Sequence, residues 1–411
     1  MSAETKERPG RRHLAATSGA RKKSVSVRIA VRTTLLEWAR ARSGIDDEIW
    51  EQRFPRYEAW CRGETAPTLK QLEDFAHKTH TPVGFFFLNE PPTETVPIPD
   101  FRTVGDRAVG APDALLSANL LDVIYACQAR QEWYRDHQLL NGESPLSFVG
   151  TATVRDPVEG VAARIRVLLD WTPASRARCR TWDGALTWLR EHAEAAGVLV
   201  MISGIVGSDT HRTLDPQEFR GFALVDAYAA LVFVNGADSK AAQVFTFAHE
   251  LAHLWLGETA LSDIDPQSTR SNTVERWCNQ VAAELLVPMD EFRAAFAVRS
   301  DLRAQLQPLA EHFCVSAQVI LGRAREAGAL TWDDYLHELS VERERIAALI
   351  AVRGTGGNYY NTKPVQVSRR FARALVASTL EKQTPYPVAF RLLGLKKAAT
   401  FDHLADRLGV V

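Results

Sequence analysis

The stretch FTFAHELAHLWLG, residues 245–257, constrains the fold more than any other part of this 411-residue chain. It places His249, Glu250 and His253 among residues that are otherwise mostly apolar. In a buried helix, each such polar group without a partner would cost on the order of 2–7 kcal/mol. Backbone carbonyls could satisfy the histidines one by one, but a single bound cation would account for all three groups. The sequence therefore favours a metal site in this segment.

Helical geometry supports that interpretation. Asp238 or Ser239 can cap a helix whose end is marked by Gly257, giving a segment of about 18 residues and about 27 Å. The two histidines then lie one turn apart on one face, where both imidazoles can reach one tetrahedral zinc ion at about 2.0–2.1 Å. The glutamate lies about 100° round the helix and can contact a water molecule beside the ion. This H-E-x-x-H pattern is typical of zinc peptidases.

A third ligand is needed, and the residues leave its identity open. One large subclass of H-E-x-x-H peptidases has glycine at the position of Leu256 and histidine at that of Thr259, so that subclass is excluded. The following helix, NTVERWCNQVAAELLVP, offers Glu275 and Glu284 on opposite sides of its axis. Asn279, one turn after the first glutamate, could orient a ligand or simply lie on the helix surface. Periodicity alone does not choose between the two carboxylates.

Composition and length set the wider frame. At 411 residues the chain is expected to form two or three units. Residues 1–32 hold nine Lys/Arg against two Glu and have no long apolar run, so we expect residues 1–30 to be a disordered basic tail and not a signal peptide. Five scattered cysteines without a CxxC pair argue against a disulfide framework or a thiolate zinc site. With no transmembrane segment either, a cytoplasmic location is expected.

The pattern of the rest of the chain predicts an α+β protein that is mostly helical and has a small antiparallel sheet. Three apolar segments, VLVMISGIV, FRGFALVD and ALVFVNG, are typical of strands, and the last two are close enough to form a hairpin. The predicted organisation after the tail is a helical domain, a proline-rich connector leading into a long helix, a zinc peptidase domain and a C-terminal helical region, at 31–95, 96–150, 151–330 and 331–411.

The sequence resembles the ImmA/IrrE metallo-endopeptidases. FRGFALVDAYAALVFVNGADSKAAQVFTFAHELAHLWLG looks like the hairpin and zinc helix of that family, and VERWCNQVAAELLVP looks like its second ligand helix. LLEWARARSG, WCRGETAPTLKQLEDFA and FFFLNEPP resemble the helix-turn-helix-related N-terminal region of the longer members, and the likeness extends to YYNTKPVQVSRRFARALV near the C-terminus. Trp277, Cys278 and Val281 depart from the usual residues, but none of them replaces a ligand.

The resemblance implies a zincin-like core of the gluzincin type, with Glu275 as the third ligand beside His249 and His253. With Zn²⁺ as cofactor, Glu250 would deprotonate the attacking water. An extended substrate could pair with an exposed edge of the hairpin at 218–235. Several side chains could stabilise the transition state, and the sequence does not choose among them: Tyr228, His211, His312 and Arg323.

The resemblance also implies a protein substrate, a helix-turn-helix repressor or an antitoxin whose cleavage releases stress-response, mobile-element or defence genes. Two alternatives stay open: a DNA-binding regulator that uses the peptidase fold as a sensor or docking surface, and the toxin of a toxin–antitoxin or phage-defence pair. Basic residues of the N-terminal helical domain are offset by glutamates, which favours packing or substrate docking there over DNA binding. The oligomeric state is not fixed by the sequence.

Overall fold

The computed structural model describes residues 27–45, 47–94, 97–99, 117–262, 273–297, 301–350 and 359–410. The chain divides into two compact units, Met1–Pro92 and Thr93–Val411. Most of the predicted basic tail, up to residue 26, lies outside the described residues, as do residue 95 of the predicted helical domain and residues 96 and 100–116 of the predicted connector. Within the described part of the chain, no helix combines the length and apolar character needed to cross a membrane.

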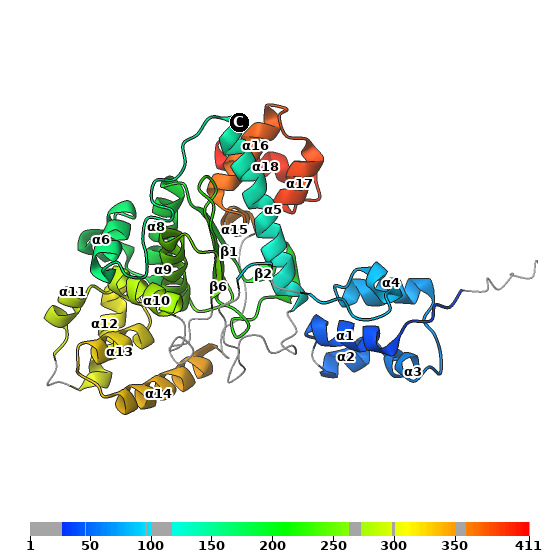
Figure 1. Cartoon of the computed structure of the whole chain (residues 1–411), viewed down its shortest axis with the longest axis horizontal. Helices are drawn as coiled ribbons and strands as arrows, with labels where there is room; N and C mark the ends of the chain where they lie inside the picture. Colours follow the sequence, from blue (N-terminus) through cyan, green and yellow to red (C-terminus); the bar gives the residue numbers. More distant parts are fainter. Residues whose placement is uncertain are drawn as a thin grey trace, which may run out of the picture. The chain divides into compact units, whose positions relative to one another are not determined.

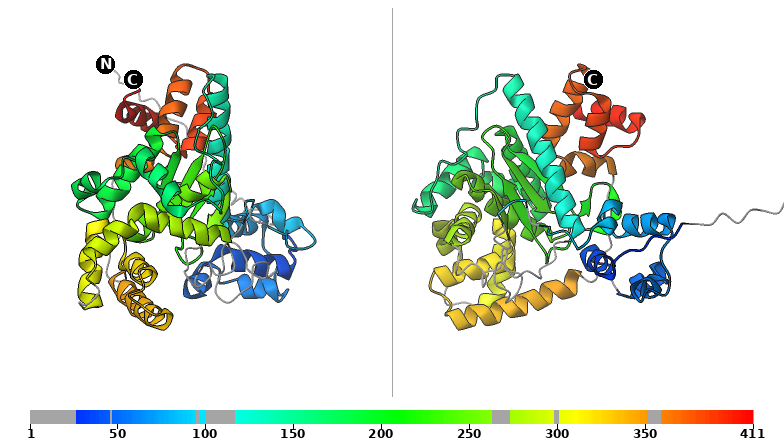
Figure 2. Two further views of the ribbon diagram at one scale, coloured as in Figure 1. Left: turned by 60° about the vertical axis from the view of Figure 1, so that its left-hand side comes forward. Right: turned by 45° about the vertical axis from the view of Figure 1, so that its right-hand side comes forward.

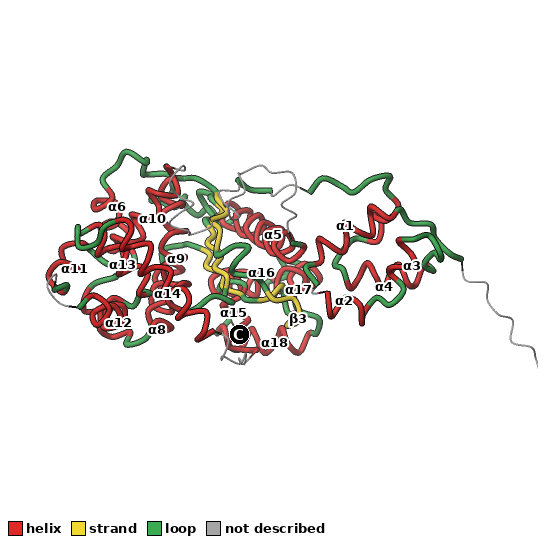
Figure 3. Tube along the Cα trace, turned by 90° about the horizontal axis from the view of Figure 1, so that it is seen from below, coloured by secondary structure: helices red, strands yellow, loops and turns green. Residues whose placement is uncertain are grey.

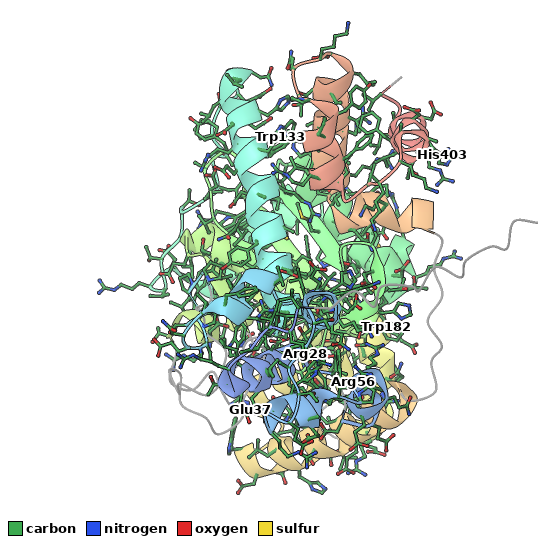
Figure 4. All side chains as sticks on the ribbon, turned by 90° about the vertical axis from the view of Figure 1, so that its right-hand side faces the viewer. Arg28, Glu37, Arg56, Trp133, Trp182 and His403 are labelled. Atoms are coloured by element: carbon green, nitrogen blue, oxygen red, sulfur yellow. The ribbon has the colours of Figure 1, made fainter. Side chains whose placement is uncertain are left out.

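The first unit is a small helical domain built around aromatic side chains. Its helices are α1 (Thr33–Ser43), α2 (Asp47–Arg53), α3 (Tyr57–Cys61), α4 (Leu69–Lys78) and the 3₁₀ helix η1 (Val83–Phe87). Trp50 and Tyr57 meet edge to face with ring centroids 5.0 Å apart, and Phe75 packs against both rings. Figure 4 labels Arg28, Glu37 and Arg56 of this unit.

Two details of the first unit bear on its predicted boundaries. Thr68 caps α4 through a reciprocal hydrogen-bond pair with Gln71, as the sequence TLKQ after a proline predicts. Residues 27–30, which the sequence assigned to the tail, instead run beside the segment before α4: Arg28 forms a bridge with Thr68, and the Ile29 amide donates to the Pro67 carbonyl at 2.8 Å.

The second unit contains the remaining helices and all six strands of the described residues. The strands are β1 (Leu199–Ser203), β2 (Ile205–Val206), β3 (Asp209–Thr213), β4 (Gly221–Leu224), β5 (Leu231–Asn235) and β6 (Ala260–Ser262). The helices are α5 (Ala118–Leu140), α6 (Val158–Leu168), α7 (Pro173–Cys179), α8 (Trp182–Ala195), α9 (Lys240–Leu256), α10 (Thr273–Leu286), α11 (Met289–Ala295), α12 (Leu302–Phe313), α13 (Ala317–Glu326), α14 (Trp332–Ile350), α15 (Tyr359–Gln366), α16 (Arg369–Leu380), α17 (Tyr386–Leu393) and α18 (Ala398–Leu408).

The main sheet has the order β1-β5-β4-β6, and a separate ribbon joins β2 and β3. The predicted hairpin is confirmed, because β4 and β5 pair antiparallel with Phe222 opposite Phe233. The expectation of a wholly antiparallel sheet is wrong, since β1 and β5 run parallel with Leu199 beside Leu231. Between β1 and β5 the chain passes through the β2–β3 ribbon and β4. It therefore enters β5 in the same direction as β1. Strand-forming residues alone do not encode that direction.

The prediction of an exposed hairpin edge is also wrong. The outer edge of β4 is covered by β6, which places Leu261 opposite Phe222, and the outer edge of β5 is covered by β1. The Leu261 amide in turn donates to the Pro99 carbonyl at 2.9 Å. Within the described residues, neither hairpin strand therefore has a free edge for an extended substrate.

Alternating side chains give the sheet two buried faces. On β1, Leu199 and Met201 join one hydrophobic cluster, whereas Val200 and Ile202 join the other. The same alternation on β4 and β5 explains why these strands are continuous apolar runs rather than amphipathic ones. Helices α8 and α9 cover one face, α5 and α16 cover the other, and α15 packs against β1 (Figures 1 and 2). Figure 3 shows the strands as a thin layer between these two groups of helices.

Buried polar contacts join the C-terminal helices to the rest of the second unit, in addition to their packing on the sheet. Glu194 at the end of α8 is buried and accepts hydrogen bonds from the Ser368 hydroxyl at 2.6 Å and the Arg369 amide at 2.8 Å, where α16 begins. Trp133 of α5 meets Phe371 of α16 with ring centroids 5.6 Å apart, and Figure 4 shows it between these two helices.

Candidate metal centre and adjacent cleft

Helix α9 has the ends that the sequence predicts. The Ser239 side chain accepts from the Ala242 amide at 3.2 Å, and Gly257 closes the helix in the left-handed conformation with φ 75°. Nearly every residue from Gln243 to Trp255 is buried, because α9 packs between the sheet, α8 and α10. The polar residues of the motif are therefore held inside the protein and not on its surface.

The two histidines of α9 meet one carboxylate of α10. The Nε2 atoms of His249 and His253 lie 3.1 Å apart, and they lie 3.1 and 3.2 Å from the two carboxylate oxygens of Glu275. All three side chains are at most 2% exposed. Ligand atoms held about 2.0–2.1 Å from a tetrahedral ion are themselves about 3.3 Å apart. The donor types and the spacing therefore fit a zinc-sized ion.

The alternative carboxylate, Glu284, lies elsewhere. It forms an ion pair with Arg323 and accepts from the Met289 amide at 3.2 Å. The structure thus brings Glu275, and not Glu284, to the histidines. The choice that periodicity left open depends on how α10 is rotated against α9.

Asn279 contacts the first histidine from α10. Its Oδ1 atom lies 2.9 Å from Nδ1 of His249. An amide oxygen can only accept, so the contact requires a proton on Nδ1 and leaves the Nε2 lone pair directed at Glu275 and His253. This is the tautomer that a metal ligand needs.

Glu250 is fully buried and lies against β4. A Cβ atom at Gly221 would lie 3.0 Å from Oε1 of Glu250, 2.6 Å from Cγ2 of Thr246 and 2.8 Å from the Phe233 carbonyl oxygen. Glycine is required there because α9 approaches the strand too closely for any side chain. Gly221 is not among the predicted site residues, although a glycine inside an apolar strand segment signals such a close approach.

Burial and neighbouring charge act together on these groups. Burial by itself would raise the pKa of Glu275, but the adjacent imidazoles of His249 and His253 lower it to about 2. Burial lowers the pKa of His253. Burial, reinforced by Glu275, raises the pKa of Cys278 well above its usual value, so this thiol stays protonated. The centre therefore offers an ionised carboxylate and a neutral imidazole at neutral pH, as metal binding requires.

The four side chains considered as transition-state donors are scattered. His211 on β3 and His312 on α12 are exposed, and Tyr228 lies in the loop between β4 and β5. Arg323 of α13 is buried and forms ion pairs with Glu284 and Glu326. Of these, only Arg323 lines the cleft described next.

A cleft of about 420 Å³ adjoins the metal centre. Its walls come from α9, α10, α13 and the start of α14, including Thr246, Arg276, Arg325 and Trp332. Asn279 lines this cleft and also contacts His249, so the cleft begins directly beside the candidate ligands. No pattern in the sequence predicts this cleft, because its lining comes from four helices and from loop residues that are far apart along the chain.

Two family models match the chain. Residues 193–325 match the IrrE N-terminal-like domain of the M78 peptidases, a segment that includes α9, α10 and every residue of the candidate metal centre. Residues 367–407 match a domain of unknown function, DUF8813, which corresponds to α16, α17 and most of α18. No curated protein matches the chain.

Proposed function

We propose that this chain is a zinc-dependent endopeptidase with a gluzincin-type core, because residues 193–325 match the IrrE N-terminal-like domain of the M78 peptidases, in agreement with the ImmA/IrrE resemblance. His249, His253 and Glu275 would bind the ion, and Glu250 would act as general base. The observation that carries the proposal is the convergence of the three ligand side chains, whose ligand atoms all lie within 4.8 Å of one another.

When bound, zinc would supply a Lewis acid that lowers the pKa of water toward about 7 and polarises a peptide carbonyl. Glu250 follows the first ligand on α9 and is placed to accept a proton from water and pass it to the leaving amine. Asn279 holds the His249 ring with its Nε2 lone pair toward the ion. Burial of these groups strengthens every electrostatic interaction among them.

We propose further that the substrate is a helix-turn-helix repressor or an antitoxin in the cytoplasm. The ImmA/IrrE resemblance supports this substrate class, and the separate N-terminal helical unit offers a docking domain for it. Cleavage would then release the genes that the repressor or antitoxin controls.

Metal analysis tests the ligand assignment. The zinc content of the purified wild type, His249→Ala, Glu275→Ala and Glu284→Ala is measured by elemental analysis. We expect zinc to be lost in the first two variants and retained in Glu284→Ala, which is the matched control because it removes a buried carboxylate from the same helix. Full zinc occupancy in both His249→Ala and Glu275→Ala would refute the assignment.

Proteolysis tests the activity separately. The wild type and Glu250→Gln are incubated with the helix-turn-helix repressor whose gene lies nearest to the gene of this protein. Cleavage by the wild type, with zinc retained but cleavage lost in Glu250→Gln, is the expected result. Equal cleavage by both proteins would exclude Glu250 as the base.

A further inference from the structure

The cleft beside the metal centre is rich in arginine. Arg220, Arg276, Arg323 and Arg325 line it, against two acidic residues, Asp238 and Glu326. The charge that the cleft offers to a ligand depends on which of these cations the protein already neutralises.

Two of the arginines have carboxylate partners. Arg323 pairs with Glu284 and Glu326 and donates to the Val287 carbonyl, and Arg220 lies 3.8 Å from Asp238. Among the described residues, no carboxylate lies within ion-pair distance of Arg276 or Arg325. Both of these side chains are exposed to solvent. The cleft therefore presents two positive charges that the described part of the protein does not neutralise.

Both arginines are placed by their surroundings. The guanidinium carbon of Arg325 lies 5.2 Å from the ring centroid of Trp332 and 5.5 Å from that of Tyr335, and both rings also line the cleft. Arg276 is one turn before Asn279 on the same face of α10. One cation is thus held over an aromatic wall, and the other is adjacent to the residue that contacts the candidate metal ligand His249.

We propose that this cleft binds an acidic segment of the peptide substrate beside the bond to be cut, with Arg276 and Arg325 pairing its carboxylates. The inference rests on the proposed peptidase function, because Asn279 joins the cleft to the metal centre. A cleft of about 420 Å³ accommodates a few side chains and is of the size typical of ligand sites.

The lining favours a peptide over a nucleic acid. Asp238 and Glu326 are paired with Arg220 and Arg323, so the net charge of the lining is that of Arg276 and Arg325 alone, which suits a few spaced carboxylates better than a continuous phosphate backbone. Gln280, Gln318 and Ser316 add neutral groups that both donate and accept. A peptide with spaced carboxylates matches this mixture better than a uniformly charged strand does.

Binding of a defined peptide tests the proposal. Full-length Glu250→Gln protein is titrated into a fluorescein-labelled ten-residue peptide of alternating Glu and Ala, and into the same peptide with Gln in place of Glu, with fluorescence anisotropy as the readout. We expect the Glu peptide to bind at least about tenfold more tightly than the Gln peptide, and the difference to shrink as salt is raised. The further variant carrying Arg276→Gln and Arg325→Gln should bind both peptides equally.

Arg391→Gln is the matched control, since it removes an exposed arginine from α17, outside the cleft lining, and should leave the preference for Glu intact. Equal binding of the two peptides by the parent protein, or an unchanged preference in the double variant, would overturn the proposal. So would tighter binding of an oligothymidylate of the same charge that disappears in the double variant, because the cleft would then be a nucleic-acid site.

The zinc content of the same samples distinguishes a failure of the acidic-peptide site from a failure of the proposed peptidase function. A preparation that binds no zinc but still prefers the Glu peptide through Arg276 and Arg325 would refute the peptidase assignment while supporting an acidic-peptide site. A preparation that binds zinc and shows no such preference would refute the acidic-peptide site alone.

Discussion

The two ends of α10 bury two glutamates in different ways. Glu275 in the first turn faces two imidazoles, and Glu284 in the last turn faces the guanidinium of Arg323. Both residues are at most 7% exposed. Arg323 supplies a permanent positive charge, so Glu284 needs no ligand, whereas two imidazoles together with a carboxylate are a donor set that a cation completes. The chemistry of the partners, and not burial, separates a candidate metal ligand from a structural ion pair.

The largest effect should come from metal removal. Zinc at about 1,000 times its Kd would stabilise the folded protein by about 4 kcal/mol. EDTA should therefore lower the melting temperature of the wild type and of Glu284→Gln, but not that of Glu275→Gln, as measured by scanning calorimetry. If EDTA still lowers the melting temperature of Glu275→Gln, then Glu275 does not differ from Glu284 in its contribution to metal binding.

A third buried charge extends the comparison. Lys363 is 2% exposed, and its described contacts are to the Ser208 hydroxyl, at 3.2 Å, and not to a carboxylate. Burial, with a smaller contribution from Arg130, lowers the pKa of Lys363 to about 8. Because the unfolded chain holds that proton up to about pH 10.5, the folded state is penalised by about 3 kcal/mol below pH 8, and the penalty disappears as the pH rises to about 10.5.

We therefore expect Lys363→Met to raise the free energy of unfolding at pH 7 and to flatten its rise between pH 8 and 10.5. Urea unfolding across this range measures the effect, with Lys396→Met, an exposed lysine, as the control. If both variants show the pH dependence of the wild type, Lys363 is not the source of the penalty.

The smallest effect concerns the residue behind the first histidine. Asn279→Ala removes the acceptor for Nδ1 of His249 and should weaken zinc binding by about 10–100-fold, without abolishing it. Competition with a chelating dye gives the affinity. Asn279→Asp keeps an acceptor and should restore most of it, and equal affinities in Asn279→Ala and wild type would show that the contact does not support metal binding.

Local signals in the sequence are sufficient to predict the helix that carries the H-E-x-x-H motif. Ser239 and Gly257 fix the ends of α9, and the hairpin follows from two apolar runs separated by a short turn. The choice between Glu275 and Glu284 required the packing of α10 on α9, which is a tertiary property. β6 is only three residues long and pairs with a strand far away in sequence, so no local pattern indicates it. The cleft arginines come from separate elements, and their proximity likewise depends on the whole fold.

The two-faced burial of the sheet has a consequence for any excised fragment. The segment that matches the M78 peptidases, 193–325, contains β1, β4 and β5, but not α5 or α16, which cover one of their faces. Cutting the chain at those limits would leave Leu199, Met201, Phe222 and Phe233 open to water. We therefore expect residues 193–325 not to fold by themselves, because the C-terminal helices form part of their hydrophobic core.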